Sequence, residues 1–208
     1  MGVALPTQRF NQLKRRIDKL DRLFLPVRSP VGSYTADEYD QVRAFIVLSH
    51  AEVEEYIEGM CLDILQKAEA RWLKSDTAGA CVAALMLYND KQSKPPKSLA
   101  LQAPKDTVDE IVKSAFKKHR DFAGRDNHGV KEANLLRLLL PIGFKESDFD
   151  TVWLGVMNSF GANRGMVAHR SASRVRQPPD PVISRQQVQD VLSGLLLLEL
   201  VFSRIKRR

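Results

Sequence analysis

The chain has 208 residues, a length typical of one domain with a single hydrophobic core. Hydrophobic residues make up 44% of it and charged residues 27%, which excludes an intrinsically disordered chain. The formal net charge is +7. A basic excess of this size makes nucleic acid or another polyanion a candidate partner, although the charge alone does not establish one.

The cysteines and the apolar runs bound the class of protein further. Cys61 and Cys81 lie in apolar surroundings, as reduced core thiols of a cytosolic protein do, and no four residues lie at the spacing of a zinc site. No lysine or arginine precedes the short apolar run at the start, and Pro6 interrupts it, unlike a signal peptide. The most apolar run, residues 191–202, contains Glu199 and is too short to span a bilayer. We therefore expect a cytoplasmic protein that has no contact with a membrane, no metal and no cofactor.

Two helices are predicted in the first third of the chain. Apolar residues recur at helical spacing over residues 10–24, and Pro26 ends this helix. Thr35 and Glu38 form a capping-box pattern, in which each side chain accepts a hydrogen bond from the backbone N–H of the other residue. A second helix is therefore predicted from Thr35 to about Lys74.

The middle of the chain continues the helical pattern. Gly59, the one internal glycine of the long second helix, leaves a kink or an end there open as an alternative. Residues 80–88 predict a short apolar helix, and residues 89–106 are rich in Pro, Lys and Ser and predict a loop. Thr107 and Glu110 repeat the capping-box pattern and open a further helix.

The last third of the chain predicts three more helices. Residues 124–129 read as a turn, and residues 130–141 as a short helix. Ser147 is predicted to cap the following helix, and Ser184, after the basic proline-containing segment 171–183, the last one. No strand pattern competes anywhere, so the predicted fold class is all-α, a helical bundle.

The helix after Ser147 carries the most informative residues. An unbroken apolar face is followed in the same register by Arg164, and His169 comes five residues later. Five residues rotate an ideal helix by ~500°, so these two side chains point ~140° apart. That geometry is poor for two ligands of one metal and suits a groove or a site shared by two subunits. The apolar face consists of Phe149, Val152, Trp153, Val156, Met157 and Phe160.

Arginine and histidine together suggest phosphoryl transfer. The planar guanidinium matches phosphate oxygens, and the imidazole titrates near neutrality and can move a proton. Without a cluster of carboxylates, the pair points toward RNA cleavage in which the 2′-OH of the substrate is the nucleophile. The simplest alternative is that Arg164 and His169 only complement the dipole at the end of their helix.

The segment NRGMVAHR, residues 163–170, resembles the Arg-x(4–6)-His signature of the HEPN superfamily. The context is similar too, most of all to the RiboL-PSP-type branch. It comprises LSHAEVEEYIEGM at residues 48–60, IGF at residues 142–144, and then an apolar helix that bears a tryptophan. The resemblance extends over roughly residues 36–205.

The resemblance implies an up-and-down HEPN-like helical bundle with additional short helices. The whole chain, 1–208, would be one such domain, with a core of roughly residues 36–205 and an N-terminal helix within residues 1–26 packed on it. It also implies a metal-independent endoribonuclease that works as a homodimer with a composite site. By motif position, Arg164 would hold the scissile phosphate and His169 would act as general base or acid. The expected products end in a 2′,3′-cyclic phosphate and a 5′-hydroxyl.

The motif departs from the family pattern at two positions. A polar residue often follows the arginine in this superfamily, and here Gly165 stands there; Asn163, just before the arginine, is a candidate to supply the missing hydrogen bond. In HEPN toxins silenced by nucleotide transfer, a tyrosine lies two residues after the histidine, where this chain has Ser171. The resemblance implies a toxin or phage-defence role, in which an antitoxin or regulatory protein would be a partner.

Further polar residues supply secondary predictions. Glu52 lies beside the apolar stripe of the second helix and is hypothesised to orient Arg164 or His169; the alternative is a solvated glutamate. His50, among apolar neighbours, is interpreted as a core histidine, while His119 and His128 are expected to be exposed and without a role.

Basic residues next to the motif, Arg170, Arg174 and Arg176, are predicted to hold the RNA backbone through phosphate contacts. The groups Lys14/Arg15/Arg16 and Lys117/Lys118/Arg120 favour a solvated face. Two other functions stay open at this point. One is a non-catalytic HEPN module for RNA binding or dimerisation, and the other is an adaptor that binds a partner through its leucine-rich last helix.

Overall fold

The computed structural model describes residues 6–29, 32–88, 107–169 and 178–207, and within these ranges the side chains of residues 169 and 207 are left aside. The described residues are mostly helical and contain no strand, which confirms the predicted all-α class. The α-helices are α1 Gln8–Phe24, α2 Ala36–Ser75, α3 Ala80–Tyr88, α4 Val108–Asp121, α5 Glu132–Leu139, α6 Thr151–His169 and α7 Pro181–Arg207. Short π or 3₁₀ turns, η1 Phe122–Asp126, η2 Leu140–Ile142 and η3 Glu146–Asp148, join some of them.

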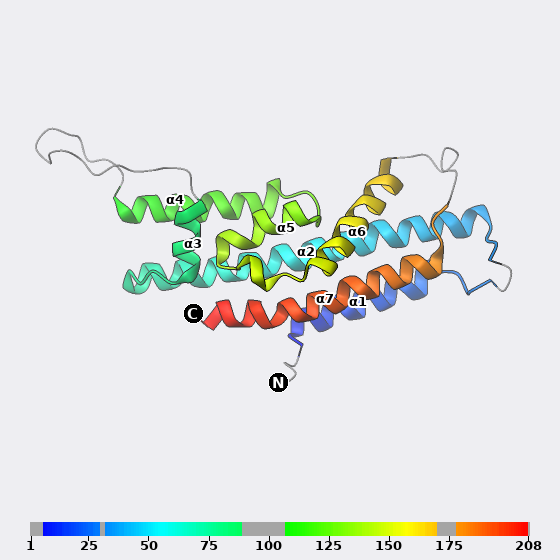
Figure 1. Ribbon diagram of the computed structural model, residues 1–208, viewed down its shortest axis with the longest axis horizontal. Coiled ribbons are helices and arrows are strands. Elements are labelled where there is room, and N and C mark those ends of the chain that lie inside the picture. Colours follow the sequence, from blue (N-terminus) through cyan, green and yellow to red (C-terminus); the bar gives the residue numbers. More distant parts are fainter. Residues whose placement is uncertain (1–5, 30–31, 89–106, 170–177, 208) are drawn as a thin grey trace, which may run out of the picture.

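Helix α2 is the axis of the molecule and spans most of its length (Figure 1). Helices α1 and α7 lie along α2, while α3, α4 and α5 cover its C-terminal half. Helix α6 crosses the N-terminal half of α2 and also packs on α7. The end of α6 therefore lies where the first turns of α2 and α7 meet it.

The predicted capping boxes are confirmed at both positions. Thr35 with Glu38 caps α2, and Thr107 with Glu110 caps α4, each with both reciprocal hydrogen bonds. Helix α2 continues through Gly59 without an end, so its 40 residues extend about 60 Å.

Two predicted caps are wrong by a few residues. Asp150, not Ser147, caps α6, because its carboxylate accepts hydrogen bonds from the N–H groups of Val152 and Trp153. Asp180, not Ser184, caps α7 through the N–H groups of the second and third helical residues. In both cases an aspartate three or four residues from the predicted serine offers the stronger, charged acceptor at the helix N-terminus.

Buried side chains from all seven helices form one contiguous hydrophobic cluster. Phe45, Phe116, Phe160 and Phe202 are its largest fully buried members. Cys61 and Cys81 are buried and unoxidised, as predicted. Helix α1 belongs to the same cluster through Phe10, Leu13, Ile17 and Leu20.

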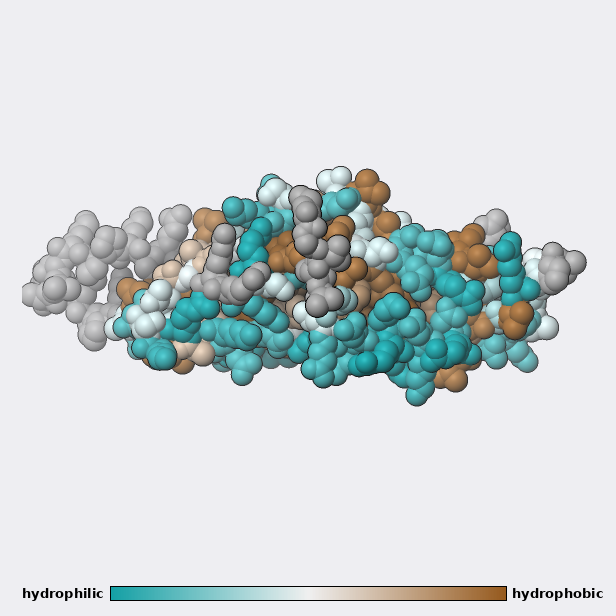
Figure 2. All heavy atoms as spheres, turned by 90° about the horizontal axis from the view of Figure 1, so that it is seen from below, coloured by the Kyte–Doolittle hydropathy of each residue, from teal (hydrophilic) through white to brown (hydrophobic). Residues whose placement is uncertain are grey.

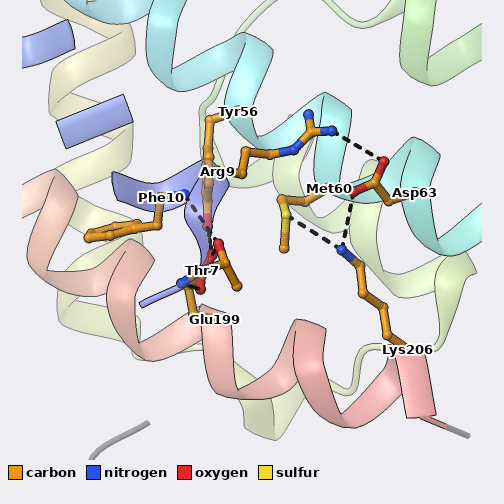
Figure 3. Close-up of polar contacts among 8 residues, drawn as sticks. All are labelled: Thr7, Arg9, Phe10, Tyr56, Met60, Asp63, Glu199 and Lys206. Atoms are coloured by element: carbon orange, nitrogen blue, oxygen red, sulfur yellow. Dashed lines mark hydrogen bonds and ion pairs between the residues drawn. The ribbon is translucent and has the colours of Figure 1, made fainter. Parts of the chain in front are cut away.

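A buried carboxylate, that of Glu199, lies where α1, α2 and α7 meet (Figure 3). The Glu199 carboxylate accepts hydrogen bonds from the Tyr56 hydroxyl and from the backbone N–H and hydroxyl of Thr7, the latter two at 2.8 and 2.7 Å. Burial, and then the bond to Glu199, raise the pKa of Tyr56, so its hydroxyl stays a donor. We call Thr7, Tyr56 and Glu199 the Glu199 cluster. It fastens the first turn of α1 to α2 and α7.

The surface is largely hydrophilic on the face shown in Figure 2, with hydrophobic residues in separate patches. Large hydrophobic side chains exposed on α6 and α7 include Val152, Met166, Ile183 and Leu197. Within the described ranges, no helix combines the length and apolar character that a membrane span requires.

Candidate active site

The apolar face of α6 holds the motif in place. Trp153, Met157 and Phe160 are buried against α2 and α7, and the Trp153 indole N–H donates to the Val191 carbonyl at 3.2 Å. Leu154 is buried as well, whereas Val152, predicted to lie on this face, is 77% exposed. These contacts fix α6 along most of its length, and its last turns carry the motif.

Arg164 follows Phe160 by one turn and lies beside His50 of α2. The His50 ring packs on Phe160 with 5.3 Å between centroids. Burial, and then the positive charge of Arg164, lower the pKa of His50 from 6.5 to about 4. Arg164 is half-buried, and within the described part of the chain it forms no ion pair with a carboxylate. A cation in this setting can accept an anionic ligand without first giving up a partner.

His50 itself is held as a neutral core residue, which confirms its interpretation from the sequence. Its side chain is buried, and Nδ1 lies 3.6 Å from the carboxylate of Glu54, one turn along α2. With its pKa near 4, His50 is uncharged at neutral pH and adds no repulsion to Arg164.

The last turn of α6 brings His169 to the end of the helix. Arg43 of α2 donates from Nη2 to the Val167 carbonyl at 2.9 Å, two residues before His169. That bond satisfies one of the last carbonyls of α6, which have no partner within the helix, and it fixes the backbone of the motif.

Small residues separate the two motif positions. Gly161, Gly165 and His169 recur every four residues and so share one edge of α6, which we call the α6 edge. Arg164 borders this edge on the side of α2. Among the residues that the structure describes, apart from its chain neighbours, none would lie within 4 Å of a Cβ atom added at Gly165. The residue that fits the family pattern least well therefore leaves space at its own position in the motif.

Asn163 faces another side of α6. Its Nδ2 donates to the Gln187 side chain of α7 at 2.8 Å. The two amides, with Arg43, Ile46 and other residues, line a pocket of about 120 Å³ between α2, α6 and α7. Asn163 thus ties α6 to α7 at the level of the motif.

The sequence profile of one protein family, described as RiboL-PSP-HEPN, matches residues 11–202. The chain belongs to the RiboL-PSP-HEPN family. No curated protein and no solved structure matches the chain. Membership of this HEPN family connects the chain with RNA-related function.

The contacts of this HEPN chain correct the hypothesis for Glu52. Its carboxylate accepts from Nε of Arg16 in α1 at 2.7 Å. Glu52 lies two residues after His50, which rotates the helix by about 200° and turns Glu52 away from α6. Glu52 therefore ties α1 to α2, and Glu54 is the carboxylate on the side of Arg164.

Other predicted residues have different outcomes. Arg170, Arg174 and Arg176, predicted to contact RNA, lie outside the described residues. His119, expected to be exposed, is buried, because its Nε2 bonds to the Leu138 carbonyl at 2.9 Å inside the core.

Sequence reasoning missed Arg43, Glu54 and Gln187 around the motif. The i, i+4 spacing of His50 and Glu54 is a visible signal for a paired histidine. Arg43 and Gln187 contact α6 from other helices, and no local sequence pattern predicts contacts between segments so far apart in the chain. In the part of the chain that the structure describes, no three His, Cys, Asp or Glu side chains gather as metal ligands do.

Proposed function

We propose that this HEPN protein is a metal-independent endoribonuclease with Arg164 and His169 as its catalytic residues. The observation that carries the proposal is Arg164, a half-buried arginine without an ion pair among the described residues, at the border of the open α6 edge. A structural arginine in such a position normally pairs with a carboxylate, as Arg16 and Arg185 do in this protein.

The chemistry follows from the two side chains. The 2′-oxygen of the substrate attacks the neighbouring phosphorus, and the bond from phosphorus to the 5′-oxygen breaks. Imidazole of His169 takes the 2′-OH proton, and an acid, water or a second His169, protonates the leaving oxygen. Arg164 binds the phosphate and offsets the negative charge that grows on it. The products carry a 2′,3′-cyclic phosphate and a 5′-hydroxyl.

A homodimer supplies the second histidine in this proposal. The surface of α6 opposite its packed face exposes a strip of small and apolar residues, Val152, Gly155, Ser159, Ala162 and Met166. On an ideal helix, His169 lies roughly 60° from the centre of this strip and Arg164 roughly 160°. A second copy packed on the strip would therefore approach His169 first.

Cleavage of labelled RNA in excess EDTA tests the activity. We expect wild type to cut and Arg164→Ala and His169→Ala each to cut at least about 100-fold more slowly, the usual loss when one charge-stabilising group is removed. Arg15→Ala, which removes an exposed arginine from α1, should leave the rate unchanged. Wild type that retards RNA in a gel without cutting it would support the alternative, a non-catalytic binding module.

The oligomeric state has its own test. Ser159→Arg puts a large cation in the middle of the exposed strip and should give a monomer by light scattering that no longer cuts RNA. Ser114→Arg is the matched control, an exposed helical serine on α4, and should change neither property. An active Ser159→Arg monomer would contradict the shared site.

A toxin or phage-defence role completes the proposal. Expression of the wild type in a bacterial host should then arrest growth, and Arg164→Ala at equal expression should not. Equal growth with both proteins would remove this role while leaving the cleavage chemistry to be judged by the EDTA assay.

A further inference from the structure

Lys131 lies at the start of α5, next to α6. Its side chain lies across Gly161 of α6. A Cβ atom added at residue 161 would come within 2.7 Å of Lys131 Cγ and 3.4 Å of its Cε. The lysine stem can take this course only because residue 161 is a glycine.

The backbone beneath Lys131 is fixed to the same helix. The N–H of Glu132 donates to Asn158 Oδ1 at 3.0 Å, and Asn158 Nδ2 donates back to the Glu132 carboxylate at 3.0 Å. Asn158 precedes Gly161 by one turn. The reciprocal pair therefore holds the start of α5 against α6, directly before the position where the lysine stem crosses.

The charges around Lys131 leave it available. The Lys131 side chain is exposed, and it forms no ion pair with any described residue. The acidic residue next to it in the chain, Glu132, accepts a hydrogen bond from Asn158. The Lys131 stem therefore lies at the Gly161 end of the α6 edge, while Arg164 borders the middle of the same edge.

The spacing suits a nucleic-acid backbone. Gly161 and Gly165 are about 6 Å apart along the helix, and His169 follows about 6 Å later. Neighbouring phosphates along one RNA strand are separated by a comparable distance. Gly161 makes room for the Lys131 stem, and Gly165 has no side chain that would keep a backbone away from the helix.

We propose that the α6 edge is the track of a single RNA strand, with Lys131 bound to a phosphate next to the scissile one. The inference rests on the proposed function, because it uses Arg164 and His169 to locate the scissile phosphate. Lys131 would contribute affinity and register but no chemistry, since a lysine that contacts a neighbouring phosphate positions the substrate without reading its sequence.

Binding of a 2′-O-methyl oligonucleotide, which cannot be cut by 2′-OH attack, tests the track by fluorescence anisotropy at several salt concentrations. Lys131→Ala should weaken binding several-fold and reduce the slope of log K against log salt by about 0.7, the value for one phosphate contact to a single strand. Lys131→Arg should retain both. Lys19→Ala, an exposed lysine on α1, should match the wild type.

Gly161→Ala supplies the decisive variant, because its Cβ displaces the lysine stem and leaves the charge in the protein. We expect Gly161→Ala to weaken binding about as much as Lys131→Ala, and the double variant to be no weaker than either. Fully additive losses, or a Lys131→Ala variant that binds like Lys19→Ala, would overturn the track. If wild type binds with the predicted slope but never cuts cleavable RNA, the track stands and the proposed nuclease function fails.

Discussion

The Glu199 cluster and the α6 edge are both places where polar groups meet an apolar core, and they differ in what those groups contact. In the Glu199 cluster, the phenol and the threonine both donate to the carboxylate, and Glu199 and Tyr56 are buried. At the α6 edge, Arg164 and Lys131 form no ion pair with a described residue, and no described side chain fills the space at Gly165. A polar group whose hydrogen bonds are complete stabilises the fold. A fixed cation with no partner is suited to bind a ligand.

The largest expected effect that separates the two regions comes from filling the α6 edge. Gly165→Leu should reduce cleavage at least about 100-fold, because the new side chain occupies the space between Arg164 and His169. Stability should not fall, since no described residue beyond its chain neighbours lies within 4 Å of an added Cβ atom and leucine favours helix over glycine. Cleavage rate and thermal midpoint, measured on one preparation, check both parts. Retained activity would mean that the RNA does not approach this edge.

His50, which lies beside Arg164, should make the free energy of unfolding fall by about 3 kcal/mol between neutral and acidic pH. Its pKa is about 4 in the fold and 6.5 in an ordinary setting, so between these values the unfolded chain binds a proton that the folded one does not. The stabilisation is complete above pH 6.5 and is lost as the pH falls toward 4, at about 1.4 kcal/mol per pKa unit.

Urea unfolding at pH 7 and pH 4.5 measures this loss. Burial lowers the pKa of His119 in the same direction, so the contribution of His50 needs its own variant. His50→Gln should show a clearly smaller loss than wild type over the same interval. An identical loss in both proteins would contradict the burial of a neutral histidine beside Arg164.

Removing one donor from the Glu199 cluster should affect stability and nothing else. Tyr56→Phe leaves a buried carboxylate short of one hydrogen bond, which costs about 1.5–3 kcal/mol when the partner is charged. RNA cleavage by the folded protein should be unchanged. Tyr39→Phe, a half-buried tyrosine on the same helix, is the control and should be close to neutral. A loss of cleavage in folded Tyr56→Phe would erase the distinction between the two regions.

The smallest effect expected is a gain. Gly165→Ala should stabilise the protein by about 0.5–1 kcal/mol through helix propensity. At Gly194 the same change should destabilise it, because the added Cβ would overlap the Trp153 ring. Thermal unfolding of both variants tests whether Gly165 lies in unfilled space while Gly194 is tightly packed. Destabilisation by Gly165→Ala would show that the position is packed.

Local patterns predicted much of this structure because local physics decides it. The capping boxes at Thr35 and Thr107 and the apolar face that ends at Phe160 depend on residues in adjacent turns, and the structure confirms them except for the exposed Val152. The motif Arg164–His169 is also local, so its place at the end of α6 was visible in the sequence.

Contacts between distant segments were the part that sequence reasoning could not supply. A carboxylate such as Glu52 could orient Arg164, but its position on α2 points it toward α1, where it pairs with Arg16. His119 lies in a polar stretch and is nevertheless buried, because a carbonyl from α5 completes its hydrogen bond. Lys131 stands out only once Gly161 is seen beneath it. Each of these depends on how two helices pack, which no single segment encodes.

The central claim is that the α6 edge cuts RNA by attack of the substrate's own 2′-OH, without a metal. The most direct test uses two matched substrates in excess EDTA: an all-ribose RNA, and the same RNA with a single 2′-deoxynucleotide on the 5′ side of the mapped cut. We predict that wild type cuts the first to a 2′,3′-cyclic phosphate and a 5′-hydroxyl and does not cut the second at that position. Cleavage at the deoxy position, or cleavage of the first RNA that EDTA abolishes, would contradict the account.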